Sequence, residues 1–365
     1  MNPLYIGIMS GTSLDGADAA LVEFNEADGS PRLVGRHSVP YPAELRAELL
    51  RIHQPGENEL DRAALLGNTL AGIYAEAASG VLAATGTTAA SVRAIGCHGQ
   101  TVRHRPERGY TLQLGNPALL AEHTGITVVA DLRSRDVAAG GQGAPLVPAF
   151  HAARFRSQSI HRVVINLGGI ANLTDLPVTG PVRGFDTGPS NMLMDLWARR
   201  HFKASHDEGG AIAATGKVLP ELLAEFMAEP YLALPPPKST GRDLFDEPWL
   251  LARGVELHEP RDVMATLAAF TAQSLAAALR AHCAGATEAY ACGGGARNPH
   301  LMAQLAAALP GMRLASTEAL GVDPQWVEAM AFAWLAREAL AGRPGNLPEV
   351  TGARGLRVLG AIHPA

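Results

Sequence analysis

A glycine-bearing turn near the N-terminus carries residue types that bind phosphate and metal ions. Tyr5 to Phe24 reads YIGIMSGTSLDGADAALVEF, an apolar run, a polar turn and a second apolar run. This pattern predicts two strands joined by a turn. Gly11 and Gly16 allow backbone conformations that a Cβ would block, and hydroxyls and carboxylates come from Thr12, Ser13, Asp15 and Asp18. Such a turn can aim N–H groups at a phosphate while a carboxylate binds a cation. An ordinary hairpin loop uses the same residues, and this stretch alone does not separate the two interpretations.

Two further glycine turns follow apolar strands. Gly168-Gly169 separates the apolar runs Val163–Leu167 and Ile170–Leu176, and Asn172 follows Gly168 by four residues, as Asp15 follows Gly11. This spacing indicates a weak internal duplication, with one hairpin in each half of the chain. The third turn, Gly293–Gly295, leads from a predicted strand to a predicted helix at Asn298–Leu309.

The three turns are best explained together as a nucleotide site. The chain lacks the P-loop pattern, which is Gly-x-x-x-x-Gly-Lys followed by Ser or Thr. It also lacks the dinucleotide-binding pattern Gly-x-Gly-x-x-Gly. Two phosphate-facing hairpins and a glycine turn at a helix N-terminus would instead surround a nucleotide from two lobes. As a set, the turns favour this interpretation over chance loop composition.

Composition limits the class of protein. The 365 residues favour two domains, and the formal charge of -5 offers no basic surface for a nucleic acid. We find no leader pattern and no apolar run of membrane-spanning length. The three cysteines are too few and too scattered for a disulfide framework or a zinc site. The sequence therefore predicts a cytoplasmic protein with no nucleic-acid or membrane partner.

Strands alternate with helices, which predicts α/β layers. We expect two related lobes with a nucleotide cleft between them. The N-terminal lobe would span residues 1–148, rejoined by 342–365, and the C-terminal lobe 149–341. A polar, glycine-rich stretch from Asp131 to Pro148 lacks a periodic pattern, which is typical of a functional loop or a linker.

Seven strings along the chain resemble those of the anhydro-N-acetylmuramic acid kinase family. They are GTSLDGAD (11–18), HGQT (98–101), DLRSRDVAAGGQGAPLVP (131–148), NLGGIANLT (166–174), GFDTGPSN (184–191), STGRDLF (239–245) and CGGGARN (292–298). The resemblance implies the duplicated fold of the actin-like and hexokinase-like ATPase superfamily, with ATP as cosubstrate. It also implies that 1,6-anhydro-N-acetylmuramic acid is opened and phosphorylated to N-acetylmuramic acid 6-phosphate, in the recycling of bacterial cell-wall sugars.

The implied reaction needs a base. O6 of the anhydro sugar is bonded to C1 and has no proton to lose, so water must attack C1 and a carboxylate must take the proton of that water. By the resemblance this base is Asp186, which ends a predicted strand before a glycine turn. From the residues alone, Asp186 could equally cap the following helix, whose first turn Pro189 would suit.

The resemblance also distributes the remaining roles. Nucleotide binding falls to the turn residues Gly11, Thr12, Ser13, Leu14, Asp15, Gly16, Ala17 and Asp18, and to Gly168, Gly169, Asn172, Gly188, Gly293, Gly294 and Asn298. Asp15 would lie near Mg²⁺, directly or through water. Substrate contacts fall to Gln100, Asp131, Arg133 and Glu328.

Several of these residues have plainer interpretations. A surface ion pair would explain Asp131 and Arg133 equally well. Glu328 could be an exposed first-turn residue favoured by the helix dipole, and His98 is expected to be structural. The proline-stiffened loop 231–245 could close over the cleft or make a contact in a homodimer.

Two other functions stay open from the sequence. One is a related kinase that phosphorylates a free hydroxyl, with Asp186 deprotonating that hydroxyl. The other is an ATP-binding regulator of the same fold, although the chain shows no helix-turn-helix or spare domain of the kind that such regulators use.

Overall fold

The computed structural model describes residues 2–11, 14–242 and 244–365, so Thr12 and Ser13 lie outside it. The chain forms two compact units, Met1–Arg154 with Trp326–Ala365, and Phe155–Gln325. The sequence interpretation divided the chain at 148/149 and at 341/342. The last long helix accounts for most of the difference, because it packs on the sheet of the first unit.

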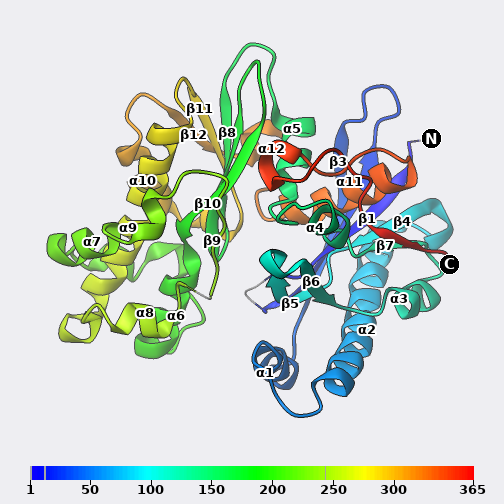
Figure 1. Cartoon of the computed structure of the whole chain (residues 1–365), viewed down its shortest axis with the longest axis horizontal. Coiled ribbons are helices and arrows are strands. Elements are labelled where there is room, and N and C mark those ends of the chain that lie inside the picture. The colour runs from blue at the N-terminus through cyan, green and yellow to red at the C-terminus, as the bar shows by residue number, and fades with distance from the viewer. Residues whose placement is uncertain (1, 12–13, 243) are drawn as a thin grey trace. The chain divides into compact units, whose positions relative to one another are not determined.

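The first unit contains a six-stranded sheet of order β13-β7-β4-β1-β2-β3 (Figure 1). Strands β1, β2 and β3 form an antiparallel meander, β4 and β7 continue parallel to β1, and β13 closes the edge antiparallel to β7. The bounds are Leu4–Met9 (β1), Gly16–Phe24 (β2), Pro31–Pro40 (β3), Val92–Cys97 (β4), Val128–Ala130 (β7) and Ala361–His363 (β13).

The second unit repeats this topology in a five-stranded sheet of order β10-β9-β8-β11-β12. Strands β8, β9 and β10 form the antiparallel meander, and β11 and β12 continue parallel to β8. The bounds are Arg162–Leu167 (β8), Ile170–Leu176 (β9), Arg183–Pro189 (β10), Glu288–Cys292 (β11) and Arg313–Ser316 (β12). The shared order confirms the duplicated α/β fold that two spaced glycine hairpins indicated.

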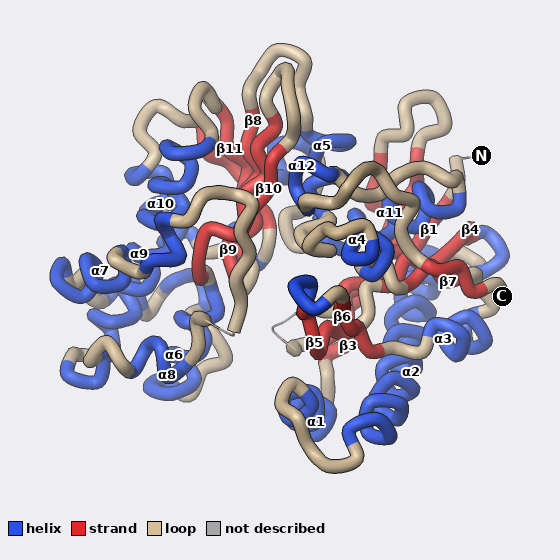
Figure 2. The backbone as a smooth tube through the Cα atoms, viewed as in Figure 1, coloured by secondary structure: helices blue, strands red, loops and turns tan. Residues whose placement is uncertain are grey.

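Helices surround both sheets (Figure 2). Those of the first unit are Ala43–Ile52 (α1), Glu59–Thr85 (α2), Pro117–Thr124 (α3), Ser134–Ala138 (α4), Val147–Phe155 (α5), Val327–Leu340 (α11) and Pro348–Thr351 (α12). A separate hairpin joins Gln100–Arg105 (β5) to Tyr110–Leu114 (β6). The stretch 131–148 is therefore not simply a loop, because it contains α4 and the start of α5. The short apolar patches in it were too brief to show a helical period.

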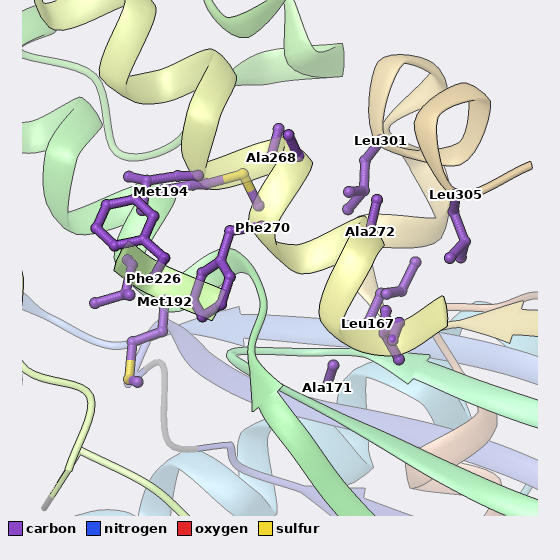
Figure 3. Packing of buried hydrophobic residues seen from close by; sticks show 14 of the residues in the cluster. Leu167, Ala171, Met192, Met194, Phe226, Ala268, Phe270, Ala272, Leu301 and Leu305 are labelled. Carbon is purple, nitrogen blue, oxygen red and sulfur yellow. The ribbon is translucent and has the colours of Figure 1, made fainter. Parts of the chain in front are cut away.

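The second unit is built on one long helix. Its helices are Asn191–Phe202 (α6), Pro220–Met227 (α7), Glu247–Leu251 (α8), Pro260–His282 (α9) and Pro299–Ala308 (α10). Phe270 of α9 packs beside Phe226 and Met194 in the core, and Ala272 of the same helix lies next to Leu301 (Figure 3). The sequence interpretation found no apolar segment of membrane-spanning length, which is wrong for α9. This helix is long and apolar enough, but 78% of its apolar window is buried inside the unit, so core packing explains its composition.

Opposite faces of β1 contact different helices, because side chains alternate along a strand. Ile6 and Ile8 belong to the same core cluster as Leu70 and Tyr74 of α2. Gly7, between them, faces α11. A Cβ on Gly7 would lie 2.6 Å from the backbone N of Ala333, closer than side chains pack.

The neighbouring strand makes the same contact with α11. A Cβ on Gly96 of β4 would lie 2.7 Å from the carbonyl carbon of Phe332 and 3.0 Å from the Cβ of Ala336. The backbone of α11 therefore rests directly on two adjacent strands, and glycine at both positions makes that approach possible.

Replacing Gly7 by alanine should lower the free energy of unfolding by at least about 3 kcal/mol, since the new methyl group meets helix backbone rather than a flexible side chain. Gly72→Ala is the matched control. Gly72 is an exposed residue of α2 with nothing within 4 Å of its Cβ position, so alanine there should stabilise by about 0.5–1 kcal/mol. Equilibrium urea unfolding measures both, and equal effects would contradict the packing described.

Candidate functional site

The turn after β1 is held by the corner between β4 and β5. The buried hydroxyl of Ser10 donates to the carbonyl of Gly99 (2.9 Å) and shares a hydrogen bond with the Tyr74 hydroxyl (2.9 Å). Gln100, a predicted substrate residue, donates from Nε2 to the carbonyl of Gly11 (3.1 Å). The strings around residues 11 and 98 are thus brought together within the first unit.

Gln100 retains an unused acceptor. The side chain is fully buried, and Oε1 has no hydrogen-bond partner among the described residues. The bond from Nε2 to Gly11 fixes which end of the amide is oxygen. A buried amide oxygen without a partner costs free energy, so this atom fits a residue that accepts a hydrogen bond from a ligand.

His98 connects the turn to Arg133. Its Nδ1–H donates to the Ser10 carbonyl (2.9 Å), and Nε2 accepts from Nε (3.2 Å) and Nη2 (2.8 Å) of Arg133. Burial, aided by the Arg133 charge, lowers the pKa of His98 to about 3. The neutral ring can accept from arginine on one nitrogen and donate to backbone from the other. The structural role expected of His98 is therefore that of a bridge.

Arg133 is oriented from two sides, since Nη1 also donates to the carbonyl of Gly143 (2.7 Å). The other predicted sugar residue of this segment, Asp131, is exposed and has φ +51. Left-handed backbone is unusual for a non-glycine residue and occurs often at functional sites. Both residues follow β7 directly, so one strand end positions them.

Two buried imidazoles should make stability depend on pH. Burial also lowers the pKa of His151 to about 3. Because both folded pKa values lie below the ordinary value of about 6.5, the unfolded chain takes up protons that the folded chain does not. The contribution of each neutral histidine to the free energy of unfolding is fully present above pH 6.5 and is lost as the pH falls toward 3. Each histidine should contribute a slope of about 1.4 kcal/mol per pH unit.

Unfolding free energies measured between pH 4.5 and 6.5 test this. Glutamine in the His98→Gln variant cannot titrate. The slope of its unfolding free energy against pH should therefore be smaller than that of the wild type, by the amount that the uptake of about one proton produces. His123→Gln, at an exposed position of α3, should leave the slope unchanged. A slope that is the same in all three proteins would show that His98 does not remain neutral in the folded state.

A buried carboxylate that sequence reasoning missed supports Arg133 indirectly, through Gly143. Asp136 is fully buried and accepts hydrogen bonds from Gly143 N (2.8 Å), Asn346 Nδ2 (2.7 Å) and Thr351 Oγ1 (2.8 Å). It holds the N–H of Gly143, and the carbonyl of the same residue accepts from Arg133. Its place in a polar, glycine-rich segment gave no sign of burial, because its partners Asn346 and Thr351 lie 210 and 215 residues further along the chain.

Only part of the predicted segment 11–18 is open to a ligand. Leu14 is buried with φ +58, Gly16 lies in β2 with its Cβ position 3.0 Å from the Pro40 Cα, and Ala17 is in the core. Asp15 is exposed and Asp18 is half-buried. Gly16 and Ala17 therefore shape the strand rather than offering side chains to a nucleotide.

The carboxylates of Asp15 and Asp18 lie close enough for their charges to interact. Asp18 accepts a hydrogen bond from the Ser38 hydroxyl (2.5 Å), and its pKa is raised by burial and, to a smaller degree, by the negative charge of Asp15. Within residues 2–11, 14–242 and 244–365 no group of three or more His, Cys, Asp or Glu could hold a metal. One or two carboxylates completed by phosphates and water are the donors that Mg²⁺ commonly uses.

In the second unit a row of polar residues crosses the sheet. Asn172 of β9 pairs with Asn166 of β8 and with Asp186 of β10. Residues directly opposite each other face the same side, with Cβ atoms about 5 Å apart. The predicted base and a predicted nucleotide residue are therefore neighbours.

The Gly168-Gly169 turn supports helix α6. The carbonyl of Gly169 accepts from Ser190 N (2.9 Å) and Met192 N (3.1 Å), and the carbonyl of Gly168 accepts from Asn191 N (3.1 Å). The carbonyls of the turn are thus used by the helix N-terminus, and the N–H groups of the turn are the donors that a phosphate could use.

The start of α6 excludes the alternative in which Asp186 caps this helix. Asp186 lies inside β10, the N-cap of α6 is Ser190, and Pro189 ends the strand rather than opening the helix. A break in pairing register follows Asp186, and Gly188 beyond it has φ +144. The irregular strand end could not be distinguished from a helix start by residue type.

The loop 231–245 lies against Asp186 within the same unit. The Asp186 N–H donates to the Lys238 carbonyl (3.1 Å), and the Tyr231 hydroxyl donates to the Asp186 carbonyl (2.9 Å). The Thr240 N–H donates to Oδ2 of Asp186 (3.0 Å). Lys238 Nζ in turn binds the carbonyls of Tyr231 (3.2 Å) and Leu232 (2.9 Å). The loop therefore holds the candidate base on its main chain and its side chain.

The third glycine turn packs closely on β8. Gly293 has φ +80, and a Cβ there would lie 2.5 Å from Oδ1 of Asn166, whereas the Cβ position of Gly294 is open. The turn continues as a short 3₁₀ helix before α10 begins at Pro299. Asn298 caps α10 by accepting from Leu301 N (3.0 Å). Its side-chain oxygen is therefore engaged, which leaves its amide nitrogen for a ligand.

Comparisons with known proteins decide the family. The family model described as anhydro-N-acetylmuramic acid kinase matches residues 3–365. The protein of that name from Nitrosospira multiformis is 55% identical, covering 99% of each chain. That from Bordetella petrii is 56% identical, covering 99% of this chain and 96% of its own. This chain belongs to the anhydro-N-acetylmuramic acid kinase family.

One solved structure agrees with the fold seen in this member of the anhydro-N-acetylmuramic acid kinase family. Component A of (R)-2-hydroxyglutaryl-CoA dehydratase from Acidaminococcus fermentans aligns with a TM-score of 0.50 at 12% identity, covering 91% of this chain and 96% of its own. At that identity the likeness concerns the fold alone.

One further predicted substrate residue lies on helix α11. Glu328 lies half-buried in the first turn of α11, in the first unit. Its position suits either a ligand contact or the helix dipole.

Proposed function

We propose that this protein is an ATP-dependent kinase that opens 1,6-anhydro-N-acetylmuramic acid with water and phosphorylates O6. The products would be N-acetylmuramic acid 6-phosphate and ADP, in the recycling of cell-wall sugars. The observation that carries the proposal is the family match over residues 3–365. The relatives that bear the family name are matched over nearly their whole length.

Asp186 is assigned the role of base. Its carboxylate would take one proton of a water molecule as the water oxygen bonds to C1 of the sugar. The C1–O6 bond then breaks, and O6 attacks the γ-phosphorus of ATP while the bond to ADP breaks. Contacts to Thr240, Lys238 and Tyr231 support this role, because the first orients the carboxylate and the other two hold the main chain of Asp186 before substrate arrives.

Sugar binding is assigned mainly to the first unit. Arg133 donates to His98 and Gly143, and a guanidinium oriented in this way suits the lactyl carboxylate of the substrate. Gln100 offers its buried oxygen to a sugar hydroxyl. Asp131 and Glu328 are assigned to further polar groups of the sugar.

Phosphate binding is assigned to the glycine turns. The Gly11 segment and the N–H groups of Gly168 and Gly169 would bind the nucleotide phosphates, with Asn172 beside them. Gly293, Gly294 and Asn298 are assigned to the remainder of the nucleotide. Such turns bind without bulky side chains, so the backbone can approach closely.

Asp15, with Asp18 beside it, is assigned to Mg²⁺. When bound, this ion would neutralise phosphate charge during transfer. The side chains themselves supply oxygen donors. Burial raises the pKa of Asp18, and the negative charge of Asp15 adds to that rise.

Asp186→Asn should lower kcat by about 10²- to 10⁴-fold, because the amide cannot take a proton but can still accept the Thr240 hydrogen bond. The dissociation constant for ATP should be unchanged. Glu225→Gln, at an exposed position of α7, is the control. Sugar-dependent ADP release measures kcat, and near-normal turnover of Asp186→Asn would rule out the base assignment.

Labelled water tests the reaction itself. In H₂¹⁸O the label should enter C1 of N-acetylmuramic acid 6-phosphate, because water supplies that oxygen. A kinase acting on a free hydroxyl would leave C1 unlabelled and would accept plain N-acetylmuramic acid. A regulator would hydrolyse ATP at a rate independent of any amino sugar.

Asp15→Asn should raise the Mg²⁺ concentration that gives half-maximal activity by about tenfold or more, since one anionic oxygen donor is lost. Glu44→Gln, which removes an exposed carboxylate from α1, should leave this concentration unchanged. Titration of activity with MgCl₂ at saturating ATP makes the comparison, and identical curves would exclude Asp15 from metal binding.

A further inference from the structure

A buried hydroxyl without a partner lies beside the candidate base. Oγ1 of Thr240 is buried and makes no hydrogen bond within the described part of the chain. The backbone N–H of the same residue donates to Oδ2 of Asp186 at 3.0 Å. One residue therefore combines a backbone N–H that donates to this carboxylate with a side-chain hydroxyl that is unsatisfied within the described part of the chain.

Leaving that hydroxyl unpaired is unfavourable. Most buried side-chain polar atoms have a protein or water partner, and one without a partner loses its hydration without compensation. Valine at this position would fill nearly the same volume without that cost. An unpaired threonine hydroxyl beside a carboxylate is therefore explained by a ligand that supplies the missing partner.

The position of the hydroxyl is fixed by the loop that carries it. Lys238 closes the loop on itself through the carbonyls of Tyr231 and Leu232, and its ammonium lies 4.8 Å from the centroid of the Tyr231 ring. The loop is then joined to β10 by the hydrogen bonds of Tyr231 and Lys238 with the main chain of Asp186. Thr240 is thus held relative to the base by contacts that do not involve its own hydroxyl.

The proposed reaction requires a second partner for water. A water molecule with a single hydrogen bond to a base can rotate about it, and attack needs one lone pair directed at C1. The water has two protons, of which only one goes to the base. The other needs an acceptor beside the base, and a threonine oxygen can provide it.

We propose that Thr240 binds the attacking water together with Asp186. This inference rests on the proposed function and adds a residue to it. The water donates one hydrogen bond to Asp186 and the other to Thr240 Oγ1. Its oxygen bonds to C1, the first proton moves to the Asp186 carboxylate, and the C1–O6 electron pair remains on O6, which takes the γ-phosphoryl group from ATP. The second proton stays on the new C1 hydroxyl, so Thr240 exchanges no proton.

Three variants test the proposal. Thr240→Val removes the hydroxyl at nearly constant volume, Thr240→Ser keeps it, and Ser239→Ala removes the neighbouring exposed hydroxyl of the same loop. Thr240→Val should lower kcat by about 10- to 100-fold, with KM for the sugar and the dissociation constant for ATP changed less than about threefold. Thr240→Ser should restore kcat to within about threefold of the wild type, and Ser239→Ala should equal the wild type.

Several outcomes would overturn the inference. They are a kcat of Thr240→Val close to that of the wild type, a loss confined to KM, and a Thr240→Ser variant as impaired as Thr240→Val. Should Thr240→Val lower the Tm markedly, Thr240→Ala replaces it, and the Thr240→Ser comparison decides in the same way. A wild-type protein without sugar-dependent ADP release would instead refute the proposed function, so the two failures are distinguishable.

Discussion

The direct contact of helix α11 with strands β1 and β4 is the constraint on which the first unit depends. Gly7 and Gly96 leave room for helix backbone where a side chain would otherwise stand. The same helix places the Phe332 ring 4.8 Å from the imidazole of His98. Because His98 then reaches both Ser10 and Arg133, the packing of one helix sets the position of the turn and of the arginine that follows β7. In this unit the geometry of the candidate site therefore depends on how α11 packs on the sheet.

The two glycine hairpins occupy equivalent places in their sheets but are stabilised differently. In the first unit, side chains of Ser10, His98 and Gln100 bind the turn after β1. In the second, the carbonyls of Gly168 and Gly169 cap helix α6. The first turn therefore depends on residues far along the chain, whereas the second depends on a helix that starts about twenty residues later. The two units thus share a sheet topology but differ in the local contacts that stabilise their turns.

Features that depend on short stretches of sequence could be predicted. Apolar runs gave most strands and long helices, and the equal spacing of Gly11–Asp15 and Gly168–Asn172 gave the duplication. The family and the α/β fold class were also correct, because whole strings matched. Long-range partners could not be predicted: Asp136 lies in a glycine-rich segment, and nothing nearby indicates that Asn346 and Thr351 will bury it. The contact of Thr240 with Asp186 could not be predicted for a similar reason, since 54 residues separate the two along the chain.

The contacts of Asp136 also bear on the order in which the protein is assembled. They join residues more than 200 positions apart, and the whole second unit lies between them in the chain. On the ribosome, the continuous second unit is complete before α11 and the C-terminal tail emerge. The first unit can close its sheet and support Arg133 only after that. The first unit, whose N-terminal part is synthesised first, is thus the last to complete its fold. Contacts between residues so far apart in the chain slow folding relative to a chain with local contacts.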